Sequence, residues 1–381
     1  MITNILLTDM KHYFLLFILL LVIITIEGCT EELHPETNGT NSPVLNEGEL
    51  TKAVLDLSVN TFAVEAQAET RASIPSNIPE NETSEEKEVH NIWVFQYDAV
   101  TKELLIKPRY YTITDQIMLQ DLPVYLKAGI PSFVYVVTNT GYDNWVNDDT
   151  DTSWQKFKNL EQLKKQTLPT AFPLRSIDKV SIPMAGASEE VEVTTGITVT
   201  VPVTRMYAKL KVKVEMLKAE MKLNNVNVRQ IPNICRIETF AGDGNGEPMN
   251  AVPFPDGTTF SSIAFAASDL EKSEDKEWAV FYVPENLQGE IENQGGNKSD
   301  AAPTNALVVD VTAEIGGEKY LYAAYPGGNS LNNFNIQRNQ VYRMTLTITG
   351  EKGQNNPSSN CFVVKPNGFL SFEPYYRVET G

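Results

Sequence analysis

Histidine is the scarcest chemistry-bearing residue of this 381-residue chain, with only three copies. His12 lies in an apolar N-terminal run and His34 in a polar segment, which leaves His90 alone in the part expected to fold. A lone histidine at the start of a strand is more often a surface or half-buried side chain than a catalyst. No Ser-His-Asp set, HExxH motif or histidine pair for a metal can be assembled. The sequence therefore predicts no enzyme and no cofactor.

Cysteine is equally scarce, with Cys29, Cys235 and Cys361 as its only copies. None of them belongs to a CxxC pair, which removes support for a zinc or redox motif. Apolar residues flank both Cys235 and Cys361. Two interpretations are open for this pair: one disulfide in an oxidising compartment, or two buried thiols that pack as small hydrophobic side chains.

Basic residues are few, since 31 Lys and Arg stand against 49 Asp and Glu and the formal net charge is −18. This charge repels a phosphate backbone, so nucleic acid is not expected as a partner. Residues 243–247 begin like a calcium loop, but Phe254 stands where the closing acid is needed, and a polar loop is preferred. The acids at 147–151 are expected before a helix because of its dipole. Glu85 and Glu86 are expected to be solvated loop charges.

The apolar run at residues 13–26 is too short to cross a membrane as a helix. At about 1.5 Å per residue it would cover roughly 21 Å, less than the ~30 Å hydrocarbon core. It predicts a secretory signal peptide over residues 1–28. Gly28-Cys29 after such a run resembles a bacterial lipoprotein signal, which would make Cys29 the acylated first residue. Ordinary secretion and an uncleaved anchor are the alternatives. Residues 29–50 are polar and aperiodic, which predicts a tether.

Short alternating runs of β-branched and aromatic residues, broken by Pro, Gly and Asn, predict an all-β fold. Residues 52–60 place Ala53, Leu55 and Leu57 on one face. Residues 206–216 place Leu210 on a buried face and Lys211 on the opposite face. One helix is expected at 154–168, with Thr152 and Gln155 as its capping box. Further strands are expected at 90–97, 129–141, 197–201, 222–229, 234–239, 277–283, 306–315, 319–325 and 340–349, with a Gly316-Gly317 hairpin turn.

These elements predict two tandem β-sandwich domains. The N-terminal domain, 51–218, would hold the helix and the strand at 206–216, and the C-terminal domain would span 219–350. Two segments stand apart in the sequence. A loose polar linker, 65–88, separates the strand at 52–60 from the first body, and the tail 351–381 carries an apolar segment at 361–372 after a polar break.

Several short segments together resemble the fimbrillin superfamily of Bacteroidales, the subunits and tip proteins of lipoprotein-derived pili. They are residues 89–95, 205–210, 282–286, 334–339 and 342–346, together with 359–364, Pro366, Gly368 and Phe372. The resemblance runs from the lipoprotein signal to the tail, and residues 29–32 resemble the export tag of surface lipoproteins. It implies two stacked transthyretin-like β-sandwiches on a protein carried to the outer membrane, as a pilus subunit or tip-associated adhesin.

In shaft subunits of that superfamily a protease cuts after an arginine and removes the first strand, and a neighbouring subunit fills the groove with its C-terminal segment. Arg71, the only arginine of the linker, is the candidate processing site. The candidate donor strand carries Cys361, Phe362, Val363, Val364, Phe369 and Phe372. The resemblance thus implies other fimbrial subunits as partners, the outer membrane through a lipid on Cys29, and a host or bacterial surface ligand.

The alternative function is a monomeric surface lipoprotein that binds glycans. Such a protein would be expected to expose aromatic side chains as sugar platforms. Trp145, Trp154, Tyr110 and Tyr111 are the candidates, and packing in the core or in loops is expected for each of them.

Overall fold

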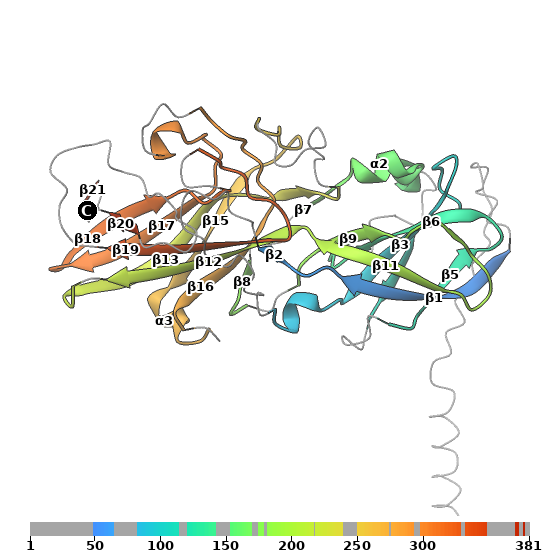
Figure 1. Ribbon diagram of the computed structural model, residues 1–381, viewed down its shortest axis with the longest axis horizontal. Helices are drawn as coiled ribbons and strands as arrows, with labels where there is room; N and C mark the ends of the chain where they lie inside the picture. The colour runs from blue at the N-terminus through green and yellow to red at the C-terminus, as the bar shows by residue number, and fades with distance from the viewer. Residues whose placement is uncertain are drawn as a thin grey trace, which may run out of the picture. The chain divides into compact units, whose positions relative to one another are not determined.

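The computed structural model (Figure 1) describes residues 49–64, 82–113, 120–141, 153–169, 174–178, 181–216, 218–238, 250–273, 276–292, 298–328, 332–348, 370–372 and 376–377. Strands dominate these residues and the helical segments are short, so the prediction of an all-β fold is confirmed. The arrangement as tandem transthyretin-like domains stays a prediction.

Eight strands form the first sheet, in the order β4-β3-β6-β9-β11-β1-β5 with β10 beside β6. They are β1 (Leu50–Val59), β3 (Asn91–Asp98), β4 (Arg109–Thr112), β5 (Leu122–Lys127), β6 (Pro131–Thr138), β9 (Met184–Ala187), β10 (Val191–Glu192) and β11 (Thr198–Arg205). Strands from both ends of this order share one core cluster, to which Leu55 of β1, Val94 of β3 and Val136 of β6 belong. The sheet therefore curves around this cluster.

Two further sheets face each other in the C-terminal half. One contains β2 (Ala63–Val64), β8 (Leu174–Arg175), β12 (Tyr207–Met216), β16 (Trp278–Pro284), β19 (Gln340–Ile348) and β20 (Leu370–Phe372). The other contains β13 (Met221–Pro232), β15 (Phe260–Ala266), β17 (Val308–Ile315), β18 (Glu318–Ala324) and β21 (Tyr376–Arg377). Leu210 and Met344 from the first sheet share a core cluster with Val228 and Val311 from the second, so the two sheets form a β-sandwich.

The turn between β17 and β18 is the predicted Gly316-Gly317 hairpin. Both glycines have positive φ, 61° and 87°, and Ile315 pairs with Glu318 across them. A two-residue hairpin needs this left-handed backbone, which glycine adopts without a steric penalty. The hairpin prediction is confirmed.

The strand expected at 206–216 belongs to the C-terminal sandwich, and its assignment to the N-terminal domain is wrong. β12 pairs with β16 on one side and with β19 on the other. The chain passes from the first sheet into this one at Met206, so a boundary at residue 218 does not match the strand pairing. The predicted facing is confirmed, because Leu210 is fully buried whereas Lys211 is half-buried.

The single helix expected over 154–168 is wrong. The chain instead forms a 3-10 helix, η2 (Ser153–Phe157), then α2 (Leu160–Lys164), then β7 (Thr167–Pro169), which pairs with β14 (Ile234–Arg236). Asn159 interrupts the helix with an extended backbone and caps α2 by accepting a hydrogen bond from the amide of Gln162. Trp154, Phe157 and Leu163 still enter one core cluster, which explains the apolar spacing. The remaining helical segments are η1 (Glu85–Lys87), α3 (Ala267–Leu270) and η3 (Lys298–Ala301).

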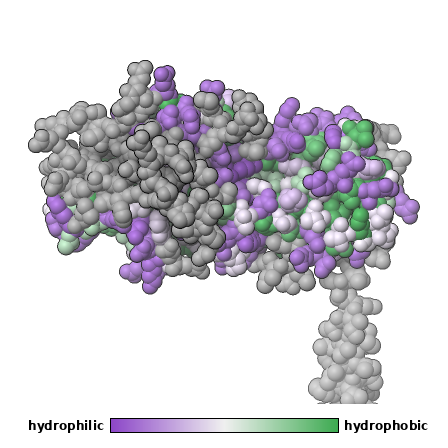
Figure 2. Space-filling view, in the orientation of Figure 1, coloured by the Kyte–Doolittle hydropathy of each residue, from purple (hydrophilic) through white to green (hydrophobic). Residues whose placement is uncertain are grey.

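The two halves also share a core. Trp93 and Tyr135, from the first sheet, belong to the same buried cluster as Tyr207 and Tyr282, from β12 and β16. On the surface, hydrophilic and hydrophobic residues are interspersed over the coloured part of Figure 2. Among the described residues, Val100 and Tyr125 are the large apolar side chains that stand exposed.

Candidate strand-exchange site

β1 lies inside the first sheet, although loose polar segments flank it in the sequence. It pairs in parallel with β11 from Val54 to Val59 and antiparallel with β5 from Leu50 to Leu55. The alternation predicted for residues 52–60 is confirmed, since Ala53 and Leu55 are 0% exposed and Leu57 is 5% exposed. As synthesised, the first strand therefore pairs on both sides with strands of its own chain.

The apolar face of β1 is a substantial part of the core of the first sheet. Burying one leucine side chain contributes about 1.5–3 kcal/mol, and Leu55 and Leu57 both contribute. Removal of β1 would leave a space between β11 and β5, which we call the β1 groove, and would expose the hydrogen-bonding edges of both strands. A segment that replaces β1 must be extended and apolar at every second residue.

Buried charged residues and one aromatic ring contact the chain just beyond the carboxyl end of β1. We call this group the Arg205 cluster, and it consists of Phe62, Glu82, Glu86, Arg205 and Lys209. Arg205 is fully buried; its Nη1 donates to the carbonyl oxygen of Asn60 at 2.7 Å and its Nε to that of Glu86 at 2.8 Å. Its Nη2 lies 3.4 Å from Glu82 Oε2, and the ring centroid of Phe62 lies 4.2 Å from its Cζ. Arg205 therefore contacts the chain on both sides of residues 65–81.

Glu86 is the second fully buried charge of the cluster. Its Oε1 lies 2.7 Å from Lys209 Nζ and accepts a hydrogen bond from the Tyr282 hydroxyl at 2.5 Å. Its Oε2 accepts a hydrogen bond from the amide of Thr83 at 2.9 Å. A buried carboxylate persists only with such pairing, because the desolvation of an isolated charge is very costly. The expectation that Glu86 is a solvated loop charge is wrong, whereas Glu85 is exposed.

Asn339 completes the contacts around the segment after β1. Its Nδ2 donates to the carbonyl oxygen of Thr61 at 2.7 Å, and its Oδ1 accepts from Arg205 Nη1 at 3.3 Å. Its backbone is left-handed, with φ 55°, a conformation that asparagine tolerates better than most residues. Two successive carbonyls, those of Asn60 and Thr61, are thus bound by side-chain donors from the body of the protein.

The electrostatics of the cluster favour the charged form of Glu82. Burial alone would raise the pKa of Glu82, but hydrogen bonds from Lys87 and from the Phe62 amide, with the charges of Arg205 and Lys87, lower that pKa below its ordinary value. Burial lowers the pKa of Arg205, and Glu82 and Glu86 act in the opposite direction. An arginine remains protonated in such a setting because its ordinary pKa is so high.

Most residues predicted to carry the function lie outside the described residues. These are Cys29, Arg71, Cys361, Phe362, Val363, Val364 and Phe369. Phe372 ends β20, which pairs in parallel with residues 346–348 of β19. β2 pairs with Gln340 and Val341 of the same strand. Because β12 occupies the other edge of β19, the segment after β1 and the C-terminal segment share one edge.

Sequence reasoning missed the Arg205 cluster. Arg205 and Lys209 alternate with apolar residues, a pattern that predicts a solvent-facing row of charges. The structure covers that row with Phe62 and η1, which are far away in the sequence. The sequence offers only a weak sign of this cluster. Two acids in the linker, Glu82 and Glu86, stand just before a strand that is apolar on both faces.

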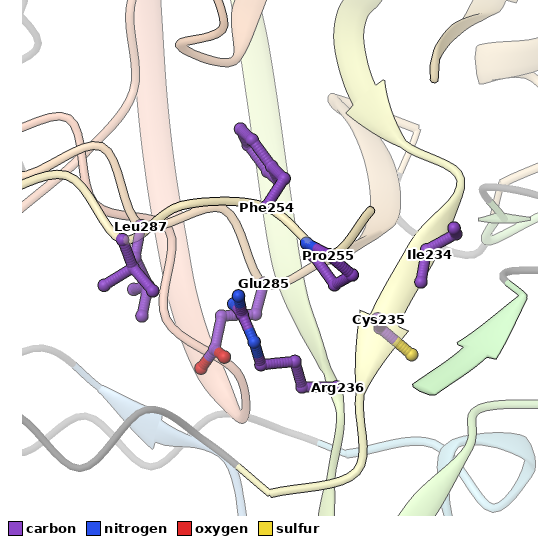
Figure 3. Close-up of a pocket in the computed structure, with 8 residues that line it drawn as sticks. Ile234, Cys235, Arg236, Phe254, Pro255, Glu285 and Leu287 are labelled. Atoms are coloured by element: carbon purple, nitrogen blue, oxygen red, sulfur yellow. The ribbon is translucent and has the colours of Figure 1, made fainter. Parts of the chain in front are cut away.

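The pocket drawn in Figure 3 is too small for an organic ligand. It has a volume of about 10 Å³, room for about one water molecule. Small-molecule sites usually offer ~300–1,000 Å³. Cys235, one of its lining residues, is a buried free thiol, and burial raises its pKa to about 12. The buried-thiol interpretation is confirmed for Cys235, whereas Cys361 lies outside the described residues.

No group of three or more His, Cys, Asp or Glu among the described residues is placed to hold a metal ion. In the same part of the chain, no helix has the length and apolarity that a membrane crossing needs. Of the aromatic residues considered as sugar platforms, Trp154 is buried and Tyr110 packs on Trp93 with centroids 5.2 Å apart. Trp145 lies outside the described residues.

Comparisons with known proteins give one partial family match and several structural matches. A family described as a domain of unknown function, DUF4906, matches residues 281–346. Among solved structures, the chain is similar to the tip fimbrial protein Mfa3 from Porphyromonas gingivalis with C-terminal truncation, at 14% identity and a TM-score of 0.46, over 78% of this chain and 94% of that chain.

It is also similar to a fimbrial assembly protein from Parabacteroides distasonis, at 14% identity and a TM-score of 0.44, over 81% of this chain and 93% of that chain. No curated protein matches the chain. Both of these solved structures are described as fimbrial proteins.

Proposed function

We propose that this protein is a non-enzymatic surface lipoprotein that serves as a fimbrial subunit or tip component and assembles by donor-strand exchange. The observation that supports this most is the position of β1. The strand fills a groove between β11 and β5, and residues 60–64 and the linker with Arg71 connect it to the rest of the chain. One peptide cut would therefore turn an integral strand into a separable peptide.

Assembly would follow in two steps. Hydrolysis of the peptide bond after Arg71 frees the N-terminal piece, and its departure opens the β1 groove. The C-terminal segment of a second copy or of a related subunit then enters, with main-chain hydrogen bonds supplying affinity and alternate side chains filling pockets. The donor must first give up the pairing of β20 with β19, which covers three of the described residues, 370–372.

A lipid on Cys29 would attach the protein to the outer membrane and present it at the cell surface. The polar residues 29–50 would then act as the tether between the lipid and the first sheet. Subunits of the same or a related kind are the partners that this proposal requires.

Treatment of the purified protein with an Arg-specific protease tests the assembly. Electrophoresis without boiling should show ladders that disappear when residues 361–381 are deleted. The Arg71→Lys variant should give no ladder, whereas Arg109→Lys, which alters β4, should assemble normally. Protein that is cut at Arg71 yet remains monomeric at high concentration would reject donor-strand exchange for this chain.

A further inference from the structure

A cut after Arg71 would divide the Arg205 cluster between two chains. Asn60, Thr61 and Phe62 lie upstream of the cut, and all other contributing residues lie downstream of it. The departing piece therefore takes with it two backbone carbonyls and one aromatic ring. The body keeps the cationic side chains Arg205 and Lys209, the two acids that pair with them, and the amide of Asn339.

Three groups of the body each lose a contact when the N-terminal piece leaves. Arg205 Nη1 loses the Asn60 carbonyl and Asn339 Nδ2 loses the Thr61 carbonyl, while the face of the guanidinium loses the ring of Phe62. Arg205 Nη1 keeps Asn339 Oδ1 as an acceptor at 3.3 Å, whereas a buried donor that loses its acceptor, as Asn339 Nδ2 does, is costly. A cation over an aromatic face is stabilised further when solvent is excluded. An extended peptide with an aromatic side chain directly after two carbonyls would satisfy all three groups.

We infer that the Arg205 cluster is a recognition site for one aromatic residue of the incoming strand, and that Phe369 of a second copy occupies it in place of Phe62. This inference rests on the proposed function and adds to it a register and a specificity determinant.

The spacing of the tail selects this register. Phe362, Phe369 and Phe372 are the three aromatic residues of the donor segment. If Phe369 stands at the Phe62 position, Phe362 falls at Leu55 and Val364 at Leu57, so both buried leucine positions of β1 receive apolar side chains, and Asn360 falls at Ala53. Phe372 in that place would put Lys365 at Leu55 and Asn367 at Leu57. Phe362 there would put Asn355 and Pro357 at these positions, so both other registers place a polar residue at a buried leucine position.

The residues between the two apolar parts fit as well. Asn367 falls at Asn60, whose side-chain Nδ2 donates to Thr204 Oγ1 at 2.8 Å, so the same hydrogen bond can form. Pro366 falls at Val59. The amides of Val54 and Asn60 donate to β11, and by alternation the Val59 amide points the other way, beyond the pairing with β5 that ends at Leu55. A proline, which has no amide hydrogen, loses no ladder bond there.

Two synthetic peptides of equal length test the inference on the full chain cut at Arg71. One covers residues 50–65 and the other residues 357–372, which match them in the proposed register. Fluorescence anisotropy should show that the tail peptide enters the cut protein, and that Phe369→Ala weakens its binding by about tenfold or more, as expected for a buried aromatic anchor. Phe372→Ala, the matched control, should change binding less than about threefold, since it removes a ring of the same size from outside the site.

The release rate of the N-terminal piece provides an independent readout. After the cut, Phe62→Ala should release the N-terminal piece faster than wild type, whereas Thr61→Ala, which alters an exposed side chain, should not. Equal binding of the Phe369→Ala and Phe372→Ala peptides would overturn the recognition site but leave strand exchange standing. Entry of the 50–65 peptide without entry of any tail peptide would reject both the site and the proposed function.

Discussion

β1 and β12 have the same length and the same kind of pairing, but only β1 is expected to leave its sheet. Each has ten residues, lies inside its sheet, and pairs with one parallel and one antiparallel neighbour. Each also buries an alternating apolar face. The pairing pattern alone therefore cannot tell an exchangeable strand from a permanent one.

The difference lies in how each strand is covered and connected. The second face of β12 is covered at its start, where Tyr207 and Lys209 are buried. The second face of β1 carries Lys52 and Ser58, which are exposed. β12 follows β11 after one residue, whereas a linker with a candidate cut site connects β1 to the body. Exchange thus requires a strand that is buried on one face and connected through a cleavable segment.

The largest effect is expected in the permanent strand. Leu210→Asp places an unpaired charge between the two sheets of the sandwich and should lower the free energy of unfolding by about 3–5 kcal/mol. Lys211→Asp, one residue away on the other face, should change it by less than about 1 kcal/mol. Urea unfolding of both variants measures the difference, and equal stabilities would show that the facing of β12 is misassigned.

A leucine-to-aspartate substitution in β1 should lower the stability of the protein only while β1 remains in its groove. Leu55→Asp should destabilise the uncut protein by about 3–5 kcal/mol, because Leu55 is fully buried. Lys52→Asp, on the exposed face, is the control. Once the strand has been cut free and removed, the remaining bodies of wild type and variant are identical in sequence. A cut protein whose stability still depends on residue 55 has kept its strand, and β1 would not be exchangeable under those conditions.

A smaller loss of stability is expected from substitutions on the charged face of β12. Lys209→Met removes the cation that pairs with the buried carboxylate of Glu86. Breaking a buried ion pair in this way lowers the free energy of unfolding by up to about 3–5 kcal/mol. The loss should be smaller here because Tyr282 and Thr83 still donate hydrogen bonds to Glu86. Lys213→Met removes a solvent-accessible partner of Glu277 and should have little effect. Thermal unfolding compares them, and equal melting temperatures would mean that the Arg205 cluster contributes nothing to stability.

Acidic pH should weaken the binding of the cut N-terminal piece to the body of the protein. The pKa of Glu82 lies below its ordinary value of 4.5, so its stabilising contribution is complete above that pH and is lost as the pH falls through the lower folded value. The groups that face it are the side chains of Arg205 and Lys87 and the amide of Phe62. Release of the cut N-terminal piece should accelerate as the pH falls below 4.5, and Glu82→Gln should flatten this dependence. A wild-type rate that does not change with pH would contradict the role of Glu82.

The smallest effect on the fold is expected at the N-terminus. Cys29→Ala removes the proposed lipid attachment site, so the protein should leave the membrane fraction or stay uncleaved, with an unchanged melting temperature. Radiolabelled fatty acid that enters wild type and variant equally would rule out acylation at Cys29.

Much of the fold follows from periodicity. The strands at 52–60, 90–97 and 340–349, and the Gly316-Gly317 turn, are where alternation and turn residues predict them. Alternation does not encode the partner of a strand, which is why β12 was assigned to the wrong sheet. Apolar spacing at 154–168 reports burial, and the cap at Asn159 decides that the helix is broken.

The Arg205 cluster shows a second limit of sequence reasoning. Its members come from residues 62, 82, 86, 205 and 209, and no local pattern connects these positions. A charge in an alternating strand is assigned to solvent by default, and only the tertiary fold shows that Arg205 and Lys209 are covered. The groups that distinguish one strand register from another therefore had to come from the structure.

The most direct measurement is the composition of the assembled material. Ladder bands obtained after cutting at Arg71 are isolated and denatured, and the peptide that ends at Arg71 is quantified by mass spectrometry against a peptide from β12. Strand exchange predicts far less than one copy of the N-terminal peptide per subunit, and the deficit should grow with the length of the ladder. One copy per subunit in every band would mean that β1 never leaves its groove, and the account would be wrong.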